Sequence, residues 1–263
     1  MADITETIEE SLAGILDISN FIPRLALRAT WEIGRIAVAR WHLDSKMDAV
    51  NRSYNKVRNE LCEVGLLAEE VYLDSIELEV ALLPNFGEVG YVFERVPLAL
   101  RLLGWREGVI YLPGDIPDLN TYVPGGSLIN TIRHEYAHAW HWMEPDFFER
   151  SWYGKAFSIP YDDTGNTPIQ DWAERKKSNR DFRRSLKNCR TPSQQERFLA
   201  REFQNEFVSE YAATLSREDL AETFMTYLKY RNSLGRFKSR PGVYKKLVAV
   251  ERAVKTARRE LGL

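Results

Sequence analysis

Residues 131–143 read TIRHEYAHAWHWM, and this stretch decides how the rest of the chain is interpreted. A proline–glycine turn at 124–126 precedes it, Ser127 can cap a helix there, and Pro145 follows. We therefore expect a helix from this cap to about Met143. Apolar residues surround the three histidines of the stretch, so the helix is expected to be buried, and buried histidines need polar partners.

Two of those histidines have the spacing of metal ligands. His134 and His138 lie at i and i+4, so both imidazoles project from one face of the helix and can reach the same ion. Glu135 completes the pattern HExxH and lies about 100° further around the helix, beside the metal rather than on it. Its carboxylate can take a proton from a water molecule that the metal activates and later pass it to a departing amine. His141, one turn further along, is expected to be a structural histidine, with a place in the cleft or against substrate as the alternative.

Catalytic zinc sites use three protein ligands, so a third ligand is expected elsewhere in the chain. The longer pattern HExxHxxGxxH is absent, because His141 and Glu144 occupy its glycine and last histidine positions. His42 is the one remaining histidine, and it lies in the N-terminal part of the chain, where a ligand is not expected. A carboxylate is therefore the expected third ligand.

Two glutamates of a downstream helix are the candidates. The chain reads SREDLAETFMTY from Ser216, which we interpret as an N-cap that pairs with Asp219 in a capping box. The helix is expected to continue to about Arg231. Glu218 and Glu222 lie one turn apart on it, so one can bind zinc while the other accepts the free N–H of a ligating histidine. The residues themselves leave open which glutamate does which.

Together these motifs resemble the gluzincin metallopeptidases, and specifically their lethal-factor-like group. The resemblance covers the two motif segments, 131–143 and 207–227, and not the rest of the chain. In that group a tyrosine precedes a helix with the pattern ExxAE, which is present here as EDLAE. The resemblance implies that Glu218 is the third zinc ligand and that Glu222 holds a ligating histidine. It also implies that Tyr211 donates a hydrogen bond to the tetrahedral oxyanion during peptide hydrolysis.

The resemblance implies an α+β, zincin-like metallopeptidase domain over residues 66–235, with a small mixed sheet packed on the helix that carries the HExxH. Alternating apolar and polar residues predict a strand at 76–84, and GVIYL predicts another at 108–112. This second strand would lie at a sheet edge and bind extended substrate, as zincins use it. A helical region (1–65) is expected before the domain and a basic amphipathic helix (236–263) after it.

The composition is that of an ordinary globular protein. The formal net charge of −2 gives the whole molecule no bias toward nucleic acid or a membrane surface. Cys62 and Cys189 lie far apart and form no metal-binding pair, so free thiols are expected. We see no membrane span and no secretory leader, and we expect a cytoplasmic protein. The polar segment 158–195 is interpreted as a mobile loop or an inserted lid with one charged helix.

The expected function is that of a zinc-dependent metalloendopeptidase acting on a protein or peptide. His134, His138 and Glu218 bind Zn²⁺, Glu135 is the general base, and Tyr211 stabilises the oxyanion. Two alternatives stay open: a catalytically inactive zincin-fold binding or regulatory protein that keeps its zinc, and an interaction protein whose zinc is purely structural. The basic tail is expected to be a solvated amphipathic helix, with an acidic partner or nucleic acid as the alternative.

Overall fold

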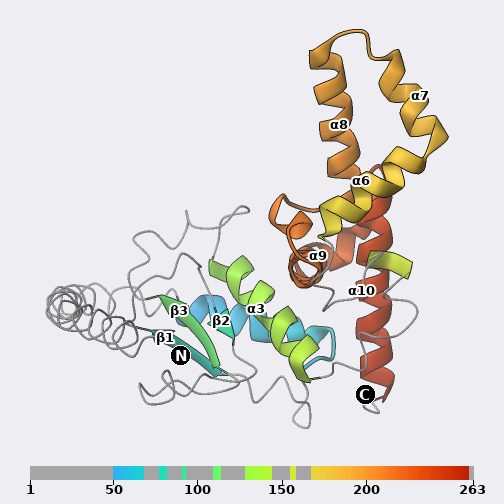
Figure 1. Ribbon diagram of the computed structural model, residues 1–263. Helices are drawn as coiled ribbons and strands as arrows, with labels where there is room; N and C mark the ends of the chain where they lie inside the picture. The colour runs from blue at the N-terminus through green and yellow to red at the C-terminus, as the bar shows by residue number, and fades with distance from the viewer. Residues whose placement is uncertain are drawn as a thin grey trace, which may run out of the picture.

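The structure is a computed structural model that describes residues 50–67, 77–81, 91–92, 109–113, 128–143, 155–157 and 167–260. Figure 1 shows the arrangement of its elements. The α-helices are α3 (Leu128–Met143), α6 (Pro168–Ser178), α7 (Arg180–Asn188), α8 (Pro192–Glu206), α9 (Ser216–Tyr230) and α10 (Pro241–Glu260), with helical residues also at 50–63 and 155–157. The remaining elements are the 3₁₀ segments η2 (Tyr211–Ala213) and η3 (Arg231–Phe237) and the strands β1 (Glu77–Ala81), β2 (Tyr91–Val92) and β3 (Val109–Pro113).

The expected α+β class is wrong, because the described part of the chain is mostly helical. Its strands are few and short: β3 pairs in parallel with β1 and antiparallel with the two-residue β2. The buried core of the described residues consists largely of helical residues. The order β1-β3-β2 also places β3 in the middle, so it is not the expected edge strand.

Within the polar segment 158–195, the described residues 167–195 fold largely into helices, and not into a loop or a lid with one helix. Threonine begins two of them in the same way: Thr167 and Thr191 each form a capping box with the glutamine three residues on, and a proline follows each threonine. Between them, the Asn179 side chain accepts from the backbone N–H of Phe182 and starts α7. We call α6, α7 and α8 together the helical arm; it projects from the rest of the molecule in Figure 1.

Helix α3 has the end that the sequence predicts, Met143, and it lies at the centre of the core. Its residues Ile132, Tyr136 and Trp140 are buried, and the helix packs against α9 and contacts β3. The rings of Trp140 and of Phe224 on α9 lie 5.4 Å apart between centroids. Each large apolar side chain buried in this way stabilises the fold by about 1.5–3 kcal/mol. This packing holds together the two helices that carry the metal motif.

A buried ion pair fixes α3 to the helix over residues 50–63. Arg133 donates from Nε to Glu60 Oε2 at 2.7 Å and from Nη2 to Glu60 Oε1 at 2.6 Å. Its Nη1 donates to Asn130 Oδ1 at 2.7 Å. The two parallel hydrogen bonds compensate for removing both charges from water. Since Arg133 directly precedes His134, the ion pair sets the rotation of α3 next to the metal motif.

Helix α10 packs against α9 and holds its first turn. The Lys246 ammonium donates to Asp219 Oδ2 at 2.6 Å, and the two side chains are only 2% and 1% exposed. The same nitrogen lies 4.4 Å from the centroid of the Phe207 ring, a favourable cation–π distance. Around this pair, Leu247 and Val250 of α10 belong to the buried core.

The expected capping box of α9 is therefore wrong. Leu215 occupies the N-cap position of α9, and its side chain makes no capping hydrogen bond. Asp219 is taken by the buried ammonium of Lys246, a stronger partner for a carboxylate than a backbone N–H. Burial raises the pKa of Asp219 to about 6, although the positive charge of Lys246 opposes this shift.

Several expectations fall on residues that the structure does not describe. They include the N-terminal helical region up to residue 49 and the cap at Ser127. Cys62 and Cys189 are free. None of the helices in the described ranges is long and apolar enough to cross a membrane.

Candidate metal centre

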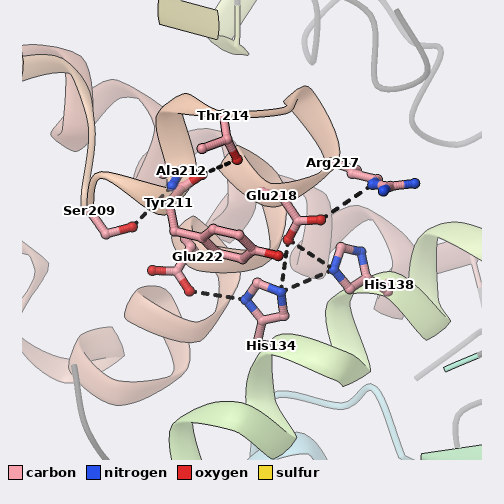
Figure 2. Close-up of polar contacts among 9 residues, drawn as sticks. All are labelled: His134, His138, Ser209, Tyr211, Ala212, Thr214, Arg217, Glu218 and Glu222. Atoms are coloured by element: carbon pink, nitrogen blue, oxygen red, sulfur yellow. Dashed lines mark hydrogen bonds and ion pairs between the residues drawn. The ribbon is translucent and has the colours of Figure 1, made fainter. Parts of the chain in front are cut away.

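The candidate site lies where α3 faces α9. His134 and His138 come from α3 and Glu218 comes from the first turn of α9, and one ligand atom of each lies within 4.8 Å of the other two. Figure 2 shows the three side chains pointing toward one another. Residues 84 positions apart in sequence are thereby brought into direct contact.

The three donor atoms are in contact even without an ion between them. Glu218 Oε2 lies 3.0 Å from His134 Nε2 and 3.3 Å from His138 Nε2, and the two Nε2 atoms are 3.1 Å apart. Two imidazole nitrogens and one carboxylate oxygen are the donor set of many catalytic zinc sites, in which water takes the fourth position. The chemistry of this set therefore fits a zinc ion.

The two glutamates of α9 occupy different places, which the residues alone left open. Glu222 Oε1 lies 3.0 Å from His134 Nδ1, on the side of the ring that faces away from Glu218, and its side chain is 2% exposed. A carboxylate at Nδ1 holds the proton there and leaves Nε2 free for a metal. Glu218 thus lies with the two Nε2 atoms, and Glu222 lies behind the ring of His134.

The charges of the cluster are strongly coupled. Burial lowers the pKa of His134, but the hydrogen bonds to Glu218 and Glu222 outweigh this and raise the pKa to about 10. Burial likewise raises the pKa of Glu218, but its contacts with His134 and His138 bring the pKa well below its usual range. Two buried carboxylates thus stabilise positive charge at this point, which is what a cation-binding site requires.

The two remaining residues of the expected site are Glu135, on α3, and Tyr211, on η2. Glu135 is buried on α3, and its negative charge contributes to the raised pKa of His134. The ring of Tyr211 stacks on the imidazole of His134 with centroids 5.7 Å apart and planes inclined by 29°. In Figure 2 the hydroxyl end of Tyr211 points toward the cluster, and 40% of the residue is exposed to solvent.

Hydrogen bonds within the turn hold Tyr211 in place. The Ser209 hydroxyl accepts from the backbone N–H of Ala212 at 3.1 Å. The Thr214 hydroxyl donates to the backbone carbonyl of Tyr211 at 2.7 Å. The buried Ala212 and Ala213 pack with Trp172 and Phe207 in a small apolar cluster. The turn is therefore anchored both to α9 and to the base of the helical arm.

Two further contacts at the site could not be predicted from the sequence. Arg217 donates from Nε to Glu218 Oε1 at 3.3 Å, so the oxygen that faces away from the histidines has its own partner. Asp219, the next residue, is held by Lys246 from α10. Neither pairing follows a spacing rule, because one depends on a side-chain rotamer and the other on how α10 packs. His141 is half-buried on α3 and is not one of the three clustered residues.

No family model, curated protein or solved structure matches this chain.

Proposed function

We propose that this protein is a zinc-dependent metalloendopeptidase. The observation that carries the proposal is the convergence of His134, His138 and Glu218 on one point, with Glu222 behind the first histidine. These residues would hold the ion. When bound, zinc supplies a Lewis acid that makes a water molecule more acidic and polarises the carbonyl of the peptide bond.

Glu135 is assigned the proton transfers. It follows His134 on α3, about 100° further around the helix, and its negative charge contributes to the raised pKa of His134. It takes a proton from the attacking water and gives it to the nitrogen of the departing amine. Its burial among apolar residues of α3 limits competition from bulk solvent.

Tyr211 is assigned the stabilisation of the oxyanion. Its stacking on His134 fixes the plane of the phenol, and its hydrogen-bonded turn limits the movement of its backbone. A preorganised phenol O–H can donate to the negative charge that develops on the former carbonyl oxygen. The exposed part of the ring leaves that face of the site open to a substrate.

Metal content tests the ligand assignment. We expect one zinc per chain in the wild type, loss of zinc in Glu218→Ala, and weakened binding in Glu222→Ala. Glu196→Ala on α8 is the matched control, because it removes an exposed glutamate far from the cluster in sequence, and it should bind like the wild type. A wild type that takes up no zinc, even after metal addition, would remove the basis of the proposal.

Activity tests the chemistry separately. Glu135→Gln keeps the size of the side chain but removes the base, so we expect full zinc content and loss of peptide hydrolysis. Undiminished hydrolysis in this variant would rule out the mechanism. If zinc binds and the wild type cleaves nothing in a broad screen of peptides and unfolded proteins, the protein is a zinc-binding regulatory protein instead of an enzyme.

A further inference from the structure

A row of positive charges runs along α7, the outer helix of the helical arm. Arg180, Arg183, Arg184 and Lys187 occupy positions i, i+3, i+4 and i+7, so they share one face of the helix. All four are exposed. We call these four residues the basic stripe. It spans about 10 Å along the helix axis, at about 1.5 Å per residue.

Among the residues that the structure describes, no ion pair involves a residue of the basic stripe. The ion pairs of the arm lie nearer its base, between Arg175 and Asp171, Arg175 and Glu206, and Lys176 and Glu202. From Lys176 to Arg201 the sequence has nine lysines and arginines against two acidic residues, while the whole chain has a net charge of −2. Positive charge is thus concentrated in this projecting element, as it is in the basic segment 236–263, of a slightly acidic protein.

The apolar residues of α7 lie on the face of the helix opposite the basic stripe. Phe182 contacts Phe198 of α8 with ring centroids 5.2 Å apart, and Lys176 lies 5.3 Å from the centroid of the same Phe182 ring. These contacts turn one face of α7 toward α8, and the basic stripe is spaced along another. The stripe is therefore a solvated surface that the arm presents outward, and not a set of core contacts.

The base of the arm joins the candidate metal centre. Trp172 of α6 and Phe207, just after α8, pack with Ala212 and Ala213 of η2. The same short turn carries Tyr211, whose ring stacks on His134. In sequence, the arm is inserted between α3 and α9, which supply the two halves of the metal motif. A partner held by the arm is thereby tethered to the segment that flanks the site.

We propose that the basic stripe binds an acidic segment of the polypeptide that the metal centre acts on. This inference rests on the proposed peptidase function. Three of the four cations are arginines, and a guanidinium pairs with a carboxylate through two parallel hydrogen bonds. The length of the stripe matches about three residues of an extended peptide, at about 3.3 Å each. Attachment outside the site raises the local concentration of the scissile bond.

A binding measurement tests the proposal without requiring turnover. The probe is a fluorescein-labelled peptide of about ten alternating aspartates and glycines, titrated with the full chain carrying Glu135→Gln and followed by fluorescence anisotropy. We expect binding that weakens as salt is added, because exposed charges are screened over about a Debye length. Removing two charges with Arg183→Gln and Arg184→Gln should weaken it about fivefold or more.

The matched control removes two exposed arginines from another helix. Arg252→Gln and Arg259→Gln on α10 change the net charge equally, and they should leave the affinity for the peptide within about twofold. Equal weakening in both double variants would show that the peptide responds to overall charge alone and would overturn the proposal. So would unchanged binding in the α7 double variant with a far-ultraviolet circular dichroism spectrum like that of the wild type.

A competition experiment decides the class of partner. A single-stranded oligonucleotide with the same number of charges should not displace the peptide at lower concentration than an unlabelled copy of the peptide does. If it does, the stripe recognises phosphates and the inference is wrong. Failure of the peptidase function is distinguishable, because it appears as missing zinc or missing hydrolysis, while peptide binding by Glu135→Gln requires neither.

Discussion

Because the ring of Tyr211 stacks on His134, the role of its hydroxyl can be tested separately from that of the ring. In Tyr211→Phe the ring can keep its stacking on the imidazole, and only the O–H is lost. We expect unchanged zinc content and a fall in kcat of about a hundredfold to a thousandfold, the range for removal of one oxyanion donor. An unchanged kcat would remove Tyr211 from the chemistry and leave it a packing residue.

Glu222 supports a ligand instead of being one, and this distinction predicts a graded effect. Glu222→Gln can still accept the N–H of His134 through its amide oxygen but lacks the negative charge. Loss of such a supporting carboxylate typically weakens metal affinity about tenfold to a hundredfold. Competition with a chromogenic chelator measures the change. Complete loss of zinc would instead place Glu222 among the ligands, and no change would mean that its charge does not support the site.

The sequence predicted the residues of the site because helical spacing brings positions i and i+4 to one face of a helix. That rule alone placed His134 with His138 and Glu218 with Glu222, and the structure brings both pairs to the same point. It could not find Lys246 as the partner of Asp219, because a contact 27 residues away depends on how two helices pack.

Among the helices, the contact between α9 and α10 depends most on a single pair of charges. Lys246→Met leaves Asp219 buried without its cation, and removing one partner of such a pair typically costs about 3–5 kcal/mol. We expect urea denaturation to show a loss of this size. Adding Asp219→Leu to Lys246→Met should recover most of it, since an apolar pair of similar volume needs no desolvation of charge.

The double variant also separates two explanations. If it is as unstable as Lys246→Met alone, the loss comes from the packing of the lysine stem and its contact with Phe207. The single variant carries a second expectation: Glu218 directly precedes Asp219, so a displaced first turn of α9 should also weaken zinc binding.

The helices of the arm show a signal that was present in the sequence. TPIQ at 167–170 and TPSQ at 191–194 both form capping boxes, and both match the pattern that starts a helix. The many charged residues of the segment instead favoured a mobile loop or a lid. The strands at 77–81 and 109–113 were anticipated, but periodicity cannot tell how many strands will join a sheet or in which order.

For the whole molecule, zinc should act as a stabiliser of the fold. Its proposed ligands come from α3 and α9, so the unfolded chain has no assembled site. At a thousandfold excess over Kd, binding to the folded state alone adds about 4 kcal/mol. We expect zinc to raise Tm by about 10 °C, judged from typical values for chains of this size. The measurement is differential scanning fluorimetry with and without zinc.

Glu218→Ala is the control for this shift. It lacks the third proposed ligand, so its Tm should respond little to zinc. An equal shift in this variant would mean that the ion binds elsewhere on the chain. Unfolding of the wild type on chelation, in place of a modest loss of stability, would favour a purely structural metal.

The packing of α10 against α9 has a consequence for the nascent chain during synthesis. A polypeptide leaves the ribosome from its N-terminus, so His134 and Glu218 emerge before Lys246 does. Until that lysine arrives, Asp219 has no cation with which to enter the core, and the turn that carries Glu218 is not held in place. A growing chain thus lacks this support for its proposed metal site until α10 has been synthesised, so we expect zinc binding to follow the emergence of Lys246.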